Sequence, residues 1–355
     1  MLLFDLKTAV STWQVVKHIH TRSLFSIRKV SQYLPPLRTY FFFTQPVIKL
    51  NNGVEMPAFG FGTWLAEPGV VGESVRLALK CGYKHIDCAA IYENEPEIGN
   101  VFGPLFSSGE YNRKDIFITS KAWVSEFKNI EGACKKTLSD LQLEYLDLYL
   151  LHLPFETENG VNIGYNAERI QKAWESMEDL VAKGLVKSVG VSNFTILKLE
   201  ELLKHSPKLV PACNQVEAHP YLPQKRLHAY CKEKGISIMA YTSLGNVNRP
   251  SMFKYTCEDP VLLEDPVVKK VAERNNATVA QVLLAWALAT GFGVIPKSVR
   301  EERIKENLDT LKVNLSPEDL QEINGITIRH RYLDQNWALT PGQKVEELWD
   351  GEMLE

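Results

Sequence analysis

The sequence predicts an α/β protein built as one (β/α)8 TIM barrel, with an N-terminal β-hairpin and a C-terminal loop over the active-site mouth. Eight apolar strand-like segments alternate with segments of helical periodicity between residues 59 and 311, and such alternation favours a parallel sheet. The strands are nearly continuous runs of Ile, Val and Leu, as expected for strands buried on both faces. Each run ends in a polar or aromatic residue. In a closed barrel these ends ring one mouth, whereas in a doubly wound sheet they gather at one crevice.

The hairpin is predicted over residues 47–56, where Asn52 and Gly53 form a strong turn signal between two short strand-like runs. Eight strands of the barrel are expected to follow it. Their predicted ranges are Phe59–Thr63, Lys84–Cys88, Ile116–Lys121, Leu146–His152, Val186–Ser192, Ala212–Glu217, Ile236–Thr242 and Gly293–Ser298.

Helices are predicted between these strands. In the segment after the fourth strand, Trp174, Met177 and Leu180 have the spacing of a half-buried helix, and Gly184 is placed to end it. The predicted helices are Gly69–Lys80, Asn129–Leu141, Ala167–Lys183, Ile196–Leu203, Gln224–Lys234, Thr278–Ala289 and Glu301–Leu311.

Residues 1–44 differ from the rest of the chain, so we divide it into this extension and a barrel domain over residues 45–355. The extension contains six Lys or Arg residues and one acidic residue, Asp5, together with several Ser and Thr. This composition is typical of a mitochondrial transit peptide, and an extension without a targeting role fits equally well. We therefore expect a cytoplasmic protein, or a mitochondrial one if residues 1–44 act as a transit peptide.

The overall composition excludes several classes of protein. The 355 residues are 45% hydrophobic and 23% charged with a net charge of −3, which gives no sign of a nucleic-acid partner. No apolar run approaches the roughly 20 residues that span a bilayer. The six cysteines form no Cys-x-x-Cys pair and are expected to be reduced thiols, and no metal site is predicted.

The candidate chemistry lies at three successive strand ends. Asp87 lies near the end of the second strand, Tyr92 follows five residues later, Lys121 ends the third strand, and His152 ends the fourth. A tyrosine with its ordinary pKa of about 10 is a poor acid unless a neighbouring cation favours its phenolate, and Lys121 is placed to supply that cation. Taken singly, such a lysine is usually a solvated rim charge and such a histidine a structural group. Four groups on adjoining strands are more readily explained as an acid–base site.

Several long motifs in the same order make the segment from Val47 to about Trp337 resemble the aldo-keto reductase superfamily. The matching motifs are Gly60-Phe-Gly-Thr-Trp64, Gly82-Tyr-Lys-His-Ile-Asp-Cys-Ala-Ala-Ile-Tyr92, Ile118-Thr-Ser-Lys-Ala-Trp123, Leu151-His-Leu-Pro154, Gly190-Val-Ser-Asn-Phe194, Asn214-Gln215 and Ile295-Pro-Lys-Ser298, followed by Arg303 and Asn307.

The resemblance implies an NADPH-dependent reductase with Asp87, Tyr92, Lys121 and His152 as its catalytic tetrad and Tyr92 as the general acid. It also implies that several residues hold the nicotinamide half of the coenzyme. Ser192, Asn193 and Gln215 would bind the ring carboxamide, and Tyr241 would stack on the ring. The other residues implied at this part of the coenzyme site are Thr63, Trp64, Asp87, Thr242 and Leu244.

At the far end of the coenzyme, the resemblance implies a site for the phosphate of NADPH. Lys297, Ser298 and Arg303 offer two cations and a hydroxyl, which suit a phosphate monoester. Asn307, one turn beyond Arg303, would face the adenine, and Val299 completes this set. The sequence has no Gly-x-Gly-x-x-Gly segment opening a βαβ unit, so a Rossmann mode of binding is not expected.

The sequence departs from the family pattern around the coenzyme. Asn246 and Asn248 stand where many members have a serine and an aspartate, and Leu65 stands where a lysine would pair with that aspartate. We therefore expect a weakly closing belt over the coenzyme. The substrate pocket is expected to be mainly apolar and to be formed by Trp64, Tyr92, Trp123, His152 and Leu153, with the tail from residue 329 to 337 completing its wall.

These patterns predict a monomeric reductase of small-molecule carbonyls, acting on aldehydes, with ketones or aldoses as further substrates, and without a membrane or nucleic-acid partner. A coenzyme-binding regulatory or structural protein of the same fold is the alternative. An NADH-preferring sugar reductase is opposed by Val299.

Overall fold

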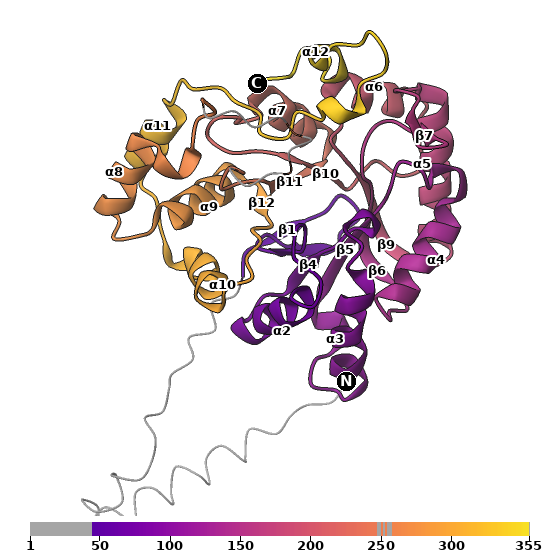
Figure 1. Cartoon of the computed structure of the whole chain (residues 1–355), viewed down its shortest axis with the longest axis horizontal. Helices are drawn as coiled ribbons and strands as arrows, with labels where there is room; N and C mark the ends of the chain where they lie inside the picture. Colours follow the sequence, from indigo (N-terminus) through magenta and orange to yellow (C-terminus); the bar gives the residue numbers. More distant parts are fainter. Residues whose placement is uncertain (1–44, 247–249, 251–252, 254–257, 355) are drawn as a thin grey trace, which may run out of the picture. The chain divides into compact units, whose positions relative to one another are not determined.

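The computed structural model describes residues 45–246, 250, 253 and 258–354 (Figure 1). Residues 1–44, and with them the predicted extension, lie outside the described residues, as does Asn248 of the predicted belt. None of the helices in this described part of the chain has the length and the apolar character of a membrane span.

Eight parallel strands form the barrel, in the order β12-β11-β10-β9-β6-β5-β4-β3. Each strand pairs with the neighbour expected for a (β/α)8 barrel, which confirms the predicted fold. The strands are β3 (Phe61–Gly62), β4 (His85–Asp87), β5 (Phe117–Ala122), β6 (Leu146–Leu151), β9 (Val186–Ser192), β10 (Cys213–Glu217), β11 (Ser237–Tyr241) and β12 (Gly293–Val294).

The first and last strands meet and close the barrel. Phe59 forms a parallel bridge with Val294, and the Gly60 and Gly62 amides donate to the carbonyls of Val294 and Pro296. Gly62 is needed at this seam because a Cβ atom there would lie 2.6 Å from the Ile295 carbonyl oxygen. Both closing strands are shorter than predicted, since only a few residues of each contribute regular pairing.

The helices surround the strands in the described body (Figure 1). They are α2 (Val71–Cys81), α3 (Glu95–Ser107), α4 (Ile130–Asp140), α5 (Ala167–Ala182), α6 (Ile196–Lys204), α7 (Lys225–Lys234), α8 (Pro266–Arg274), α9 (Val279–Thr290), α10 (Glu301–Leu308), α11 (Pro317–Asn324) and α12 (Val345–Leu348). Helix α5 begins after the capping residue Asn166. As predicted, it buries Trp174 and Met177 and is followed by Gly184, which has a φ of 71°.

Helix α3 was not among the predicted helices. Pro104 lies inside it, and proline normally interrupts a helix because it lacks an amide proton. Tertiary packing outweighs that local preference, because Ile98 and Phe102 are fully buried against the barrel. Gly99 also allows the close approach of α4, since a Cβ atom there would lie 2.0 Å from the Asp140 carbonyl oxygen.

A hairpin closes the end of the barrel where the strands begin. The predicted turn joins β1 (Val47–Lys49) and β2 (Glu55–Pro57), which pair antiparallel. Met56 is fully buried and packs with Phe117 and Leu148 from the barrel strands. A second, unpredicted hairpin, β7 (Thr157–Glu158) with β8 (Val161–Asn162), follows β6 near the opposite end.

Candidate active site

Three of the four predicted catalytic residues form one bonded cluster. Asp87 is the last residue of β4, Tyr92 ends a short 3-10 helix (Ala90–Tyr92) beyond it, and Lys121 lies in β5. The Lys121 Nζ lies 2.8 Å from Asp87 Oδ2, donates to the Cys88 carbonyl at 2.8 Å, and lies 3.4 Å from the Tyr92 hydroxyl. Parallel pairing of β4 with β5 therefore brings the carboxylate, amine and phenol together.

The charges in this cluster follow from burial and pairing. Burial alone would lower the pKa of Lys121, but Asp87 and Tyr92 raise it above its ordinary value, so the amine is protonated. Burial raises the pKa of Tyr92 to about 12, and Lys121 offsets only part of that effect. Lys121 does lower the pKa of Tyr92, as expected, but burial raises it by more, so the net pKa lies above its ordinary value.

His152 follows β6 and completes the cluster from the other side. Its ring meets the Tyr92 ring edge to face at 5.8 Å and the Trp123 ring at 5.1 Å. Burial and the charge of Lys121 lower the pKa of His152 well below its ordinary value, so the imidazole is neutral. A neutral imidazole beside the phenol can donate one hydrogen bond to a carbonyl oxygen.

The residues predicted to hold and stack on a nicotinamide lie at the end of β9, within β10 and at the end of β11. Gln215 Nε2 donates to Asp87 Oδ1 at 2.8 Å, which ties this group to the acid–base cluster. Ser192 Oγ donates to the Gln215 carbonyl at 2.8 Å. Asn193 donates to the His152 carbonyl at 3.0 Å and accepts from the Tyr241 hydroxyl at 2.6 Å. The structure therefore brings the predicted amides, hydroxyl and phenol together beside the tetrad.

The remaining residues predicted near the nicotinamide take different positions. Thr63 is buried and donates to the Asp87 carbonyl at 2.8 Å, so it supports the strand end. Trp64 is half-buried and lies 6.4 Å from the Tyr92 ring, centroid to centroid. Thr242 and Leu244 are half-buried in the loop after β11, where Thr242 has a left-handed φ of 54°.

The residues predicted to bind the phosphate end of the coenzyme lie in the segment that follows β12 and on α10. Lys297 donates to the carbonyl of Leu65 at 2.6 Å, and so joins the segments that follow β12 and β3. Ser298 is buried, while Val299 is 40% exposed and Arg303 lies exposed on α10. Asn307 is buried one turn later on the same helix. The two cations and the hydroxyl are thus on one segment but are not bonded to one another.

The predicted substrate wall is only partly as expected. Trp123 stacks on Trp337 at 5.8 Å with a 20° angle between the rings, so the tail does reach the mouth. Leu153 is 2% exposed and packs with Ala338 and Trp349, so its side chain lies beneath the tail. Trp123 and Trp337 also border a cavity of about 500 Å³, which is completed mainly by residues of the β7–β8 hairpin.

Sequence reasoning missed one buried carboxylate near this site. Glu217 ends β10, two residues after Gln215, and has no exposed surface. It accepts a hydrogen bond from His219 Nε2 at 2.9 Å and from two backbone amides of the C-terminal tail. A charged residue within an otherwise apolar barrel strand was the available signal, because buried glutamates are rare unless paired.

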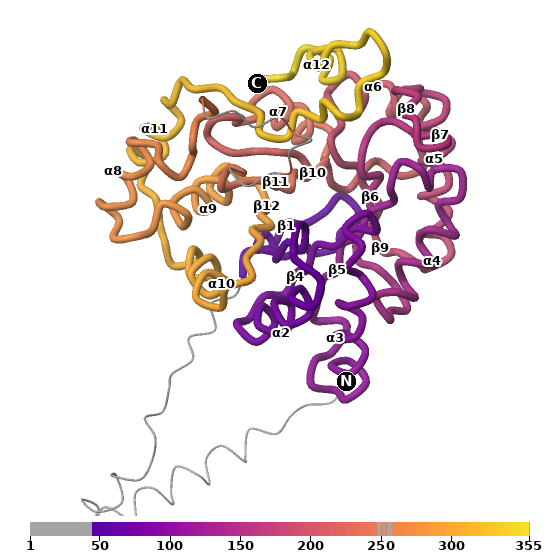
Figure 2. The backbone as a smooth tube through the Cα atoms, in the orientation of Figure 1, coloured from indigo at the N-terminus to yellow at the C-terminus, as the bar shows by residue number. Residues whose placement is uncertain are grey.

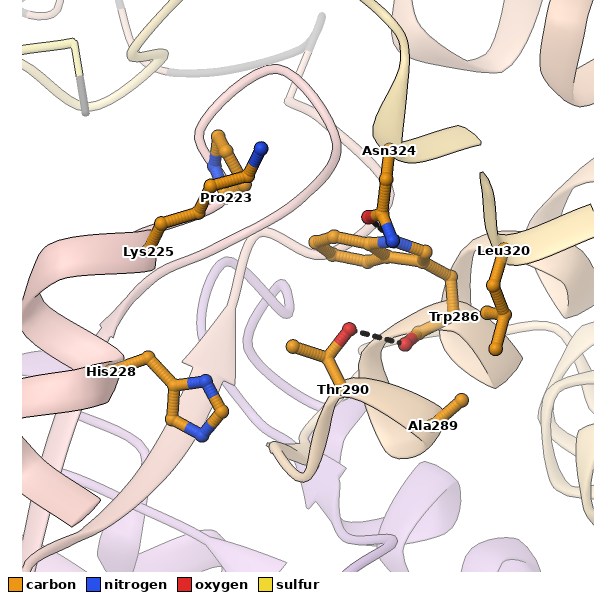
Figure 3. Close-up of a pocket in the computed structure, with 8 residues that line it drawn as sticks. All are labelled: Pro223, Lys225, His228, Trp286, Ala289, Thr290, Leu320 and Asn324. Atoms are coloured by element: carbon orange, nitrogen blue, oxygen red, sulfur yellow. Dashed lines mark hydrogen bonds between the residues drawn. The ribbon is translucent and has the colours of Figure 1, made fainter. Parts of the chain in front are cut away.

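A second cavity lies away from the candidate site. It measures about 330 Å³ and lies between α7, α9 and α11, where Thr290 donates to the Trp286 carbonyl at 2.9 Å (Figure 3). None of the predicted catalytic or coenzyme residues lines it. The cavity therefore does not bear on the chemistry of the tetrad.

A (β/α)8 barrel that carries a buried Lys–Asp pair, a phenol and a neutral imidazole at adjoining strand ends defines a class of barrel oxidoreductases that act on carbonyl groups. Comparison with known proteins agrees with this assignment. A family model described as the aldo/keto reductase family matches residues 58–328. The chain belongs to the aldo/keto reductase family.

Individual relatives match most of the chain. It is 41% identical over 298 residues to human aldo-keto reductase family 1 member A1, covering 81% of this chain and 90% of that protein. It is 39% identical over 315 residues to aldo-keto reductase family 4 member C11 of Arabidopsis thaliana, covering 86% and 98%. The solved structure of the aldose reductase from Schistosoma japonicum matches with a TM-score of 0.73 at 37% identity, covering 82% and 95%.

Proposed function

We propose that this protein reduces aldehydes to alcohols with NADPH, with Tyr92 as the general acid and with ketones or aldoses as further substrates. The observation that carries the proposal is the Tyr92–Lys121–Asp87 network beside a neutral His152. Membership of the aldo/keto reductase family supports carbonyl reduction as the reaction type.

Tyr92 is suited to deliver a proton only when the carbonyl oxygen becomes basic. Its pKa of about 12 keeps the phenol protonated at neutral pH. When the proton leaves, the phenolate is stabilised by the ammonium of Lys121, which lies 3.4 Å away and is held by Asp87. General acids of this kind typically contribute a rate factor of about 10² to 10⁴.

His152 is suited to orient the substrate. As a neutral imidazole it can donate a hydrogen bond to the carbonyl oxygen without adding a charge that would compete for the Tyr92 proton. The edge-to-face contacts with Tyr92 and Trp123 fix the orientation of the imidazole ring. Asn193 fixes the backbone of His152 by donating a hydrogen bond to its carbonyl. The carbonyl would therefore lie between the phenol and the imidazole.

The side chains near the tetrad fit a nicotinamide coenzyme, which would supply the hydride. Gln215, Ser192 and Asn193 offer amide and hydroxyl groups that match a carboxamide, and the half-buried ring of Tyr241 offers a flat surface beside them. At the other end, exposed Arg303 and half-buried Lys297 could pair with the phosphate that distinguishes NADPH from NADH.

The experiment is an assay of NADPH oxidation with a panel of aliphatic and aromatic aldehydes, performed on the wild type and on Tyr92→Phe. We expect the wild type to turn over and the variant to lose at least about 100-fold in kcat, since it lacks the acid, while its NADPH affinity changes little. Tyr111→Phe, which alters a half-buried phenol elsewhere, is the matched control.

Two results would change this assignment. Equal turnover by Tyr92→Phe and the wild type would reject Tyr92 as the acid. Coenzyme binding by the wild type without oxidation in the presence of any aldehyde or ketone would favour a coenzyme-binding regulatory or structural protein.

A further inference from the structure

The C-terminal segment, residues 329–354, runs past α6 and α7 (Figure 2). Its bonds to Glu217, the last residue of β10, place it at the end of the barrel where the strands terminate. It carries Trp337, whose ring stacks on the ring of Trp123. Trp123 in turn contacts the ring of His152. The edge of Phe155 packs against the same indole at 5.9 Å. The position of Trp337 therefore depends on how the segment is held.

Glu217 holds the beginning of the segment from inside the barrel. Its two carboxylate oxygens accept hydrogen bonds from the amides of Tyr332 at 2.6 Å and Leu333 at 2.9 Å. Neither amide is in a helix or strand, so each would otherwise need another buried acceptor. Since Glu217 lies two residues from Gln215, one rigid strand carries both a predicted coenzyme contact and the anchor of the segment.

Arg331 joins the beginning of the segment to its end. Its guanidinium donates through Nη2 to the Glu352 carbonyl and through Nε to the Met353 carbonyl, both at 3.0 Å. The same group lies 3.7 Å from the centre of the Trp349 ring. The side chain is 5% exposed, so these contacts are shielded from water. Residues 332–351 are thereby closed into a loop with Arg331 at its base.

The N-terminus of α6 provides a third attachment. Lys198 is 3% exposed and donates to the Leu348 carbonyl at 2.9 Å and to the carboxylate of Asp350. Thr195 also donates to Asp350, and the amide of Ile196 donates to the Glu352 carboxylate at 2.9 Å. Both acidic residues of the segment's end are therefore engaged by the start of one helix.

The charges of this anchor are stable at neutral pH. Burial alone would raise the pKa of Glu217, but the hydrogen bond from His219, the charge of Arg331 and the Tyr332 amide hold it below its ordinary value. Burial lowers the pKa of Arg331, which Glu217 partly offsets, and a guanidinium remains charged at any physiological pH. The carboxylate and the guanidinium are thus both ionised while buried.

We propose that Glu217 and Arg331 are positioning residues that lock the C-terminal segment in place and thereby fix Trp337 as one wall of the carbonyl site. Neither residue touches the tetrad, so their effect is transmitted through the Trp337–Trp123 stack. The consequence for catalysis, which rests on the proposed function, is selective. Aromatic substrates that need the indole wall depend on the anchor, whereas small aliphatic aldehydes do not.

The first test measures the position of the segment independently of turnover. Trypsin can cut after exposed Lys344, within the closed loop, only when the loop opens. We expect cleavage there to be at least about 10-fold faster in Glu217→Gln and Arg331→Met than in the wild type. Glu217→Gln weakens the bonds to the Tyr332 and Leu333 amides, and Arg331→Met removes the bonds to the Glu352 and Met353 carbonyls. Glu346→Gln, an exposed change in α12, is the control and should leave the rate unchanged.

The second test separates the two kinds of substrate. For 2-naphthaldehyde, we expect the KM of both variants to rise by about 10-fold or more, while kcat for propanal stays within about 2-fold of the wild type. Asp350→Asn, which loosens the partly exposed outer attachment, should give the same pattern more weakly and provides a variant under less risk of misfolding.

Unchanged cleavage after Lys344 in both anchor variants, with circular dichroism showing a folded barrel, would overturn the proposal. Equal losses for 2-naphthaldehyde and propanal would do so as well, since they would indicate a general structural role. A wild type that reduces neither aldehyde would reject the proposed function, and the cleavage rates would still decide whether Glu217 and Arg331 lock the segment.

Discussion

The Nζ of Lys121 lies 2.8 Å from the Oδ2 of Asp87, and the two side chains are 0% and 3% exposed. A pair buried this deeply is unlike the surface ion pairs of the molecule, because removing one partner leaves the other charge in a medium that does not solvate it. The same ammonium is the group that would stabilise a Tyr92 phenolate. Stability and catalysis are therefore expected to depend on one contact.

Asp87→Asn is expected to lower the free energy of unfolding by about 3–5 kcal/mol, the usual cost of breaking a buried pair. It should also reduce kcat for aldehyde reduction, because Lys121 would be less firmly held as an ammonium beside Tyr92. Urea unfolding and single-turnover kinetics measure the two effects. As a control, Asp140→Asn removes the partner of exposed Lys136 and should cost less than about 1 kcal/mol. Comparable costs for the two variants would contradict this reasoning.

Arg303→Ala is expected to weaken NADPH binding by about 10-fold or more, the loss of one charge-assisted contact with a phosphate, and to change NADH binding less than about 2-fold. Fluorescence titration of each coenzyme measures the two dissociation constants. Lys305→Ala removes another exposed cation from α10 and serves as the control. If Arg303→Ala weakened both coenzymes to the same extent, the assignment of this arginine to the phosphate would be wrong.

Glu95 is expected to make the stability of the protein depend on pH. It is 2% exposed and accepts hydrogen bonds from Ser120 at 2.5 Å and Thr137 at 3.0 Å. Burial raises its pKa from 4.5 to about 7 despite these two bonds. The folded state therefore binds this proton more tightly than the unfolded state does. The resulting stabilisation is complete below pH 4.5 and declines as the pH rises to about 7.

Glu95→Gln should remove that decline, which amounts to about 3 kcal/mol for a shift of this size. Urea unfolding at pH 5 and pH 8 measures the difference for the wild type and the variant, and Glu110→Gln provides an exposed control. The same difference between the two pH values in wild type and Glu95→Gln would show that Glu95 is not the group responsible.

Gly190→Ala is expected to disturb the coenzyme side of the site. A Cβ atom at Gly190 in β9 would lie 2.5 Å from the Cys213 carbonyl oxygen, so β10 would have to move, and β10 carries Gln215. We expect lower stability, by about 1–3 kcal/mol as for overpacking, and weaker binding of both coenzymes. Val189→Ala removes volume from the same strand and should reduce stability without weakening coenzyme binding. Loss of binding in both variants would point to unfolding instead of a displaced Gln215.

Much of the fold could be predicted because the signals for it are local. Near-continuous Val, Ile and Leu runs and the helical spacing of Trp174 and Met177 report burial, and burial on both faces indicates a parallel sheet. Helix α3 was not predicted, and its Pro104 is a local signal against a helix that the burial of Ile98 and Phe102 outweighs. The N-terminal extension lies outside the described residues and stays a prediction.

The candidate site divides in a similar way. The sequence by itself determined which residues stand at the strand ends, because a strand's last polar residue is visible in the pattern of the chain. Only the tertiary structure decided which of them meet. Gln215 bonds to Asp87 across 128 residues of chain, and Glu217 bonds to the Tyr332 amide across 115. It also decided that Leu153 lies beneath the tail and that burial outweighs Lys121 in setting the pKa of Tyr92. All of these features depend on the closed barrel, because it brings strand ends that are distant in sequence together and excludes water from the space between them.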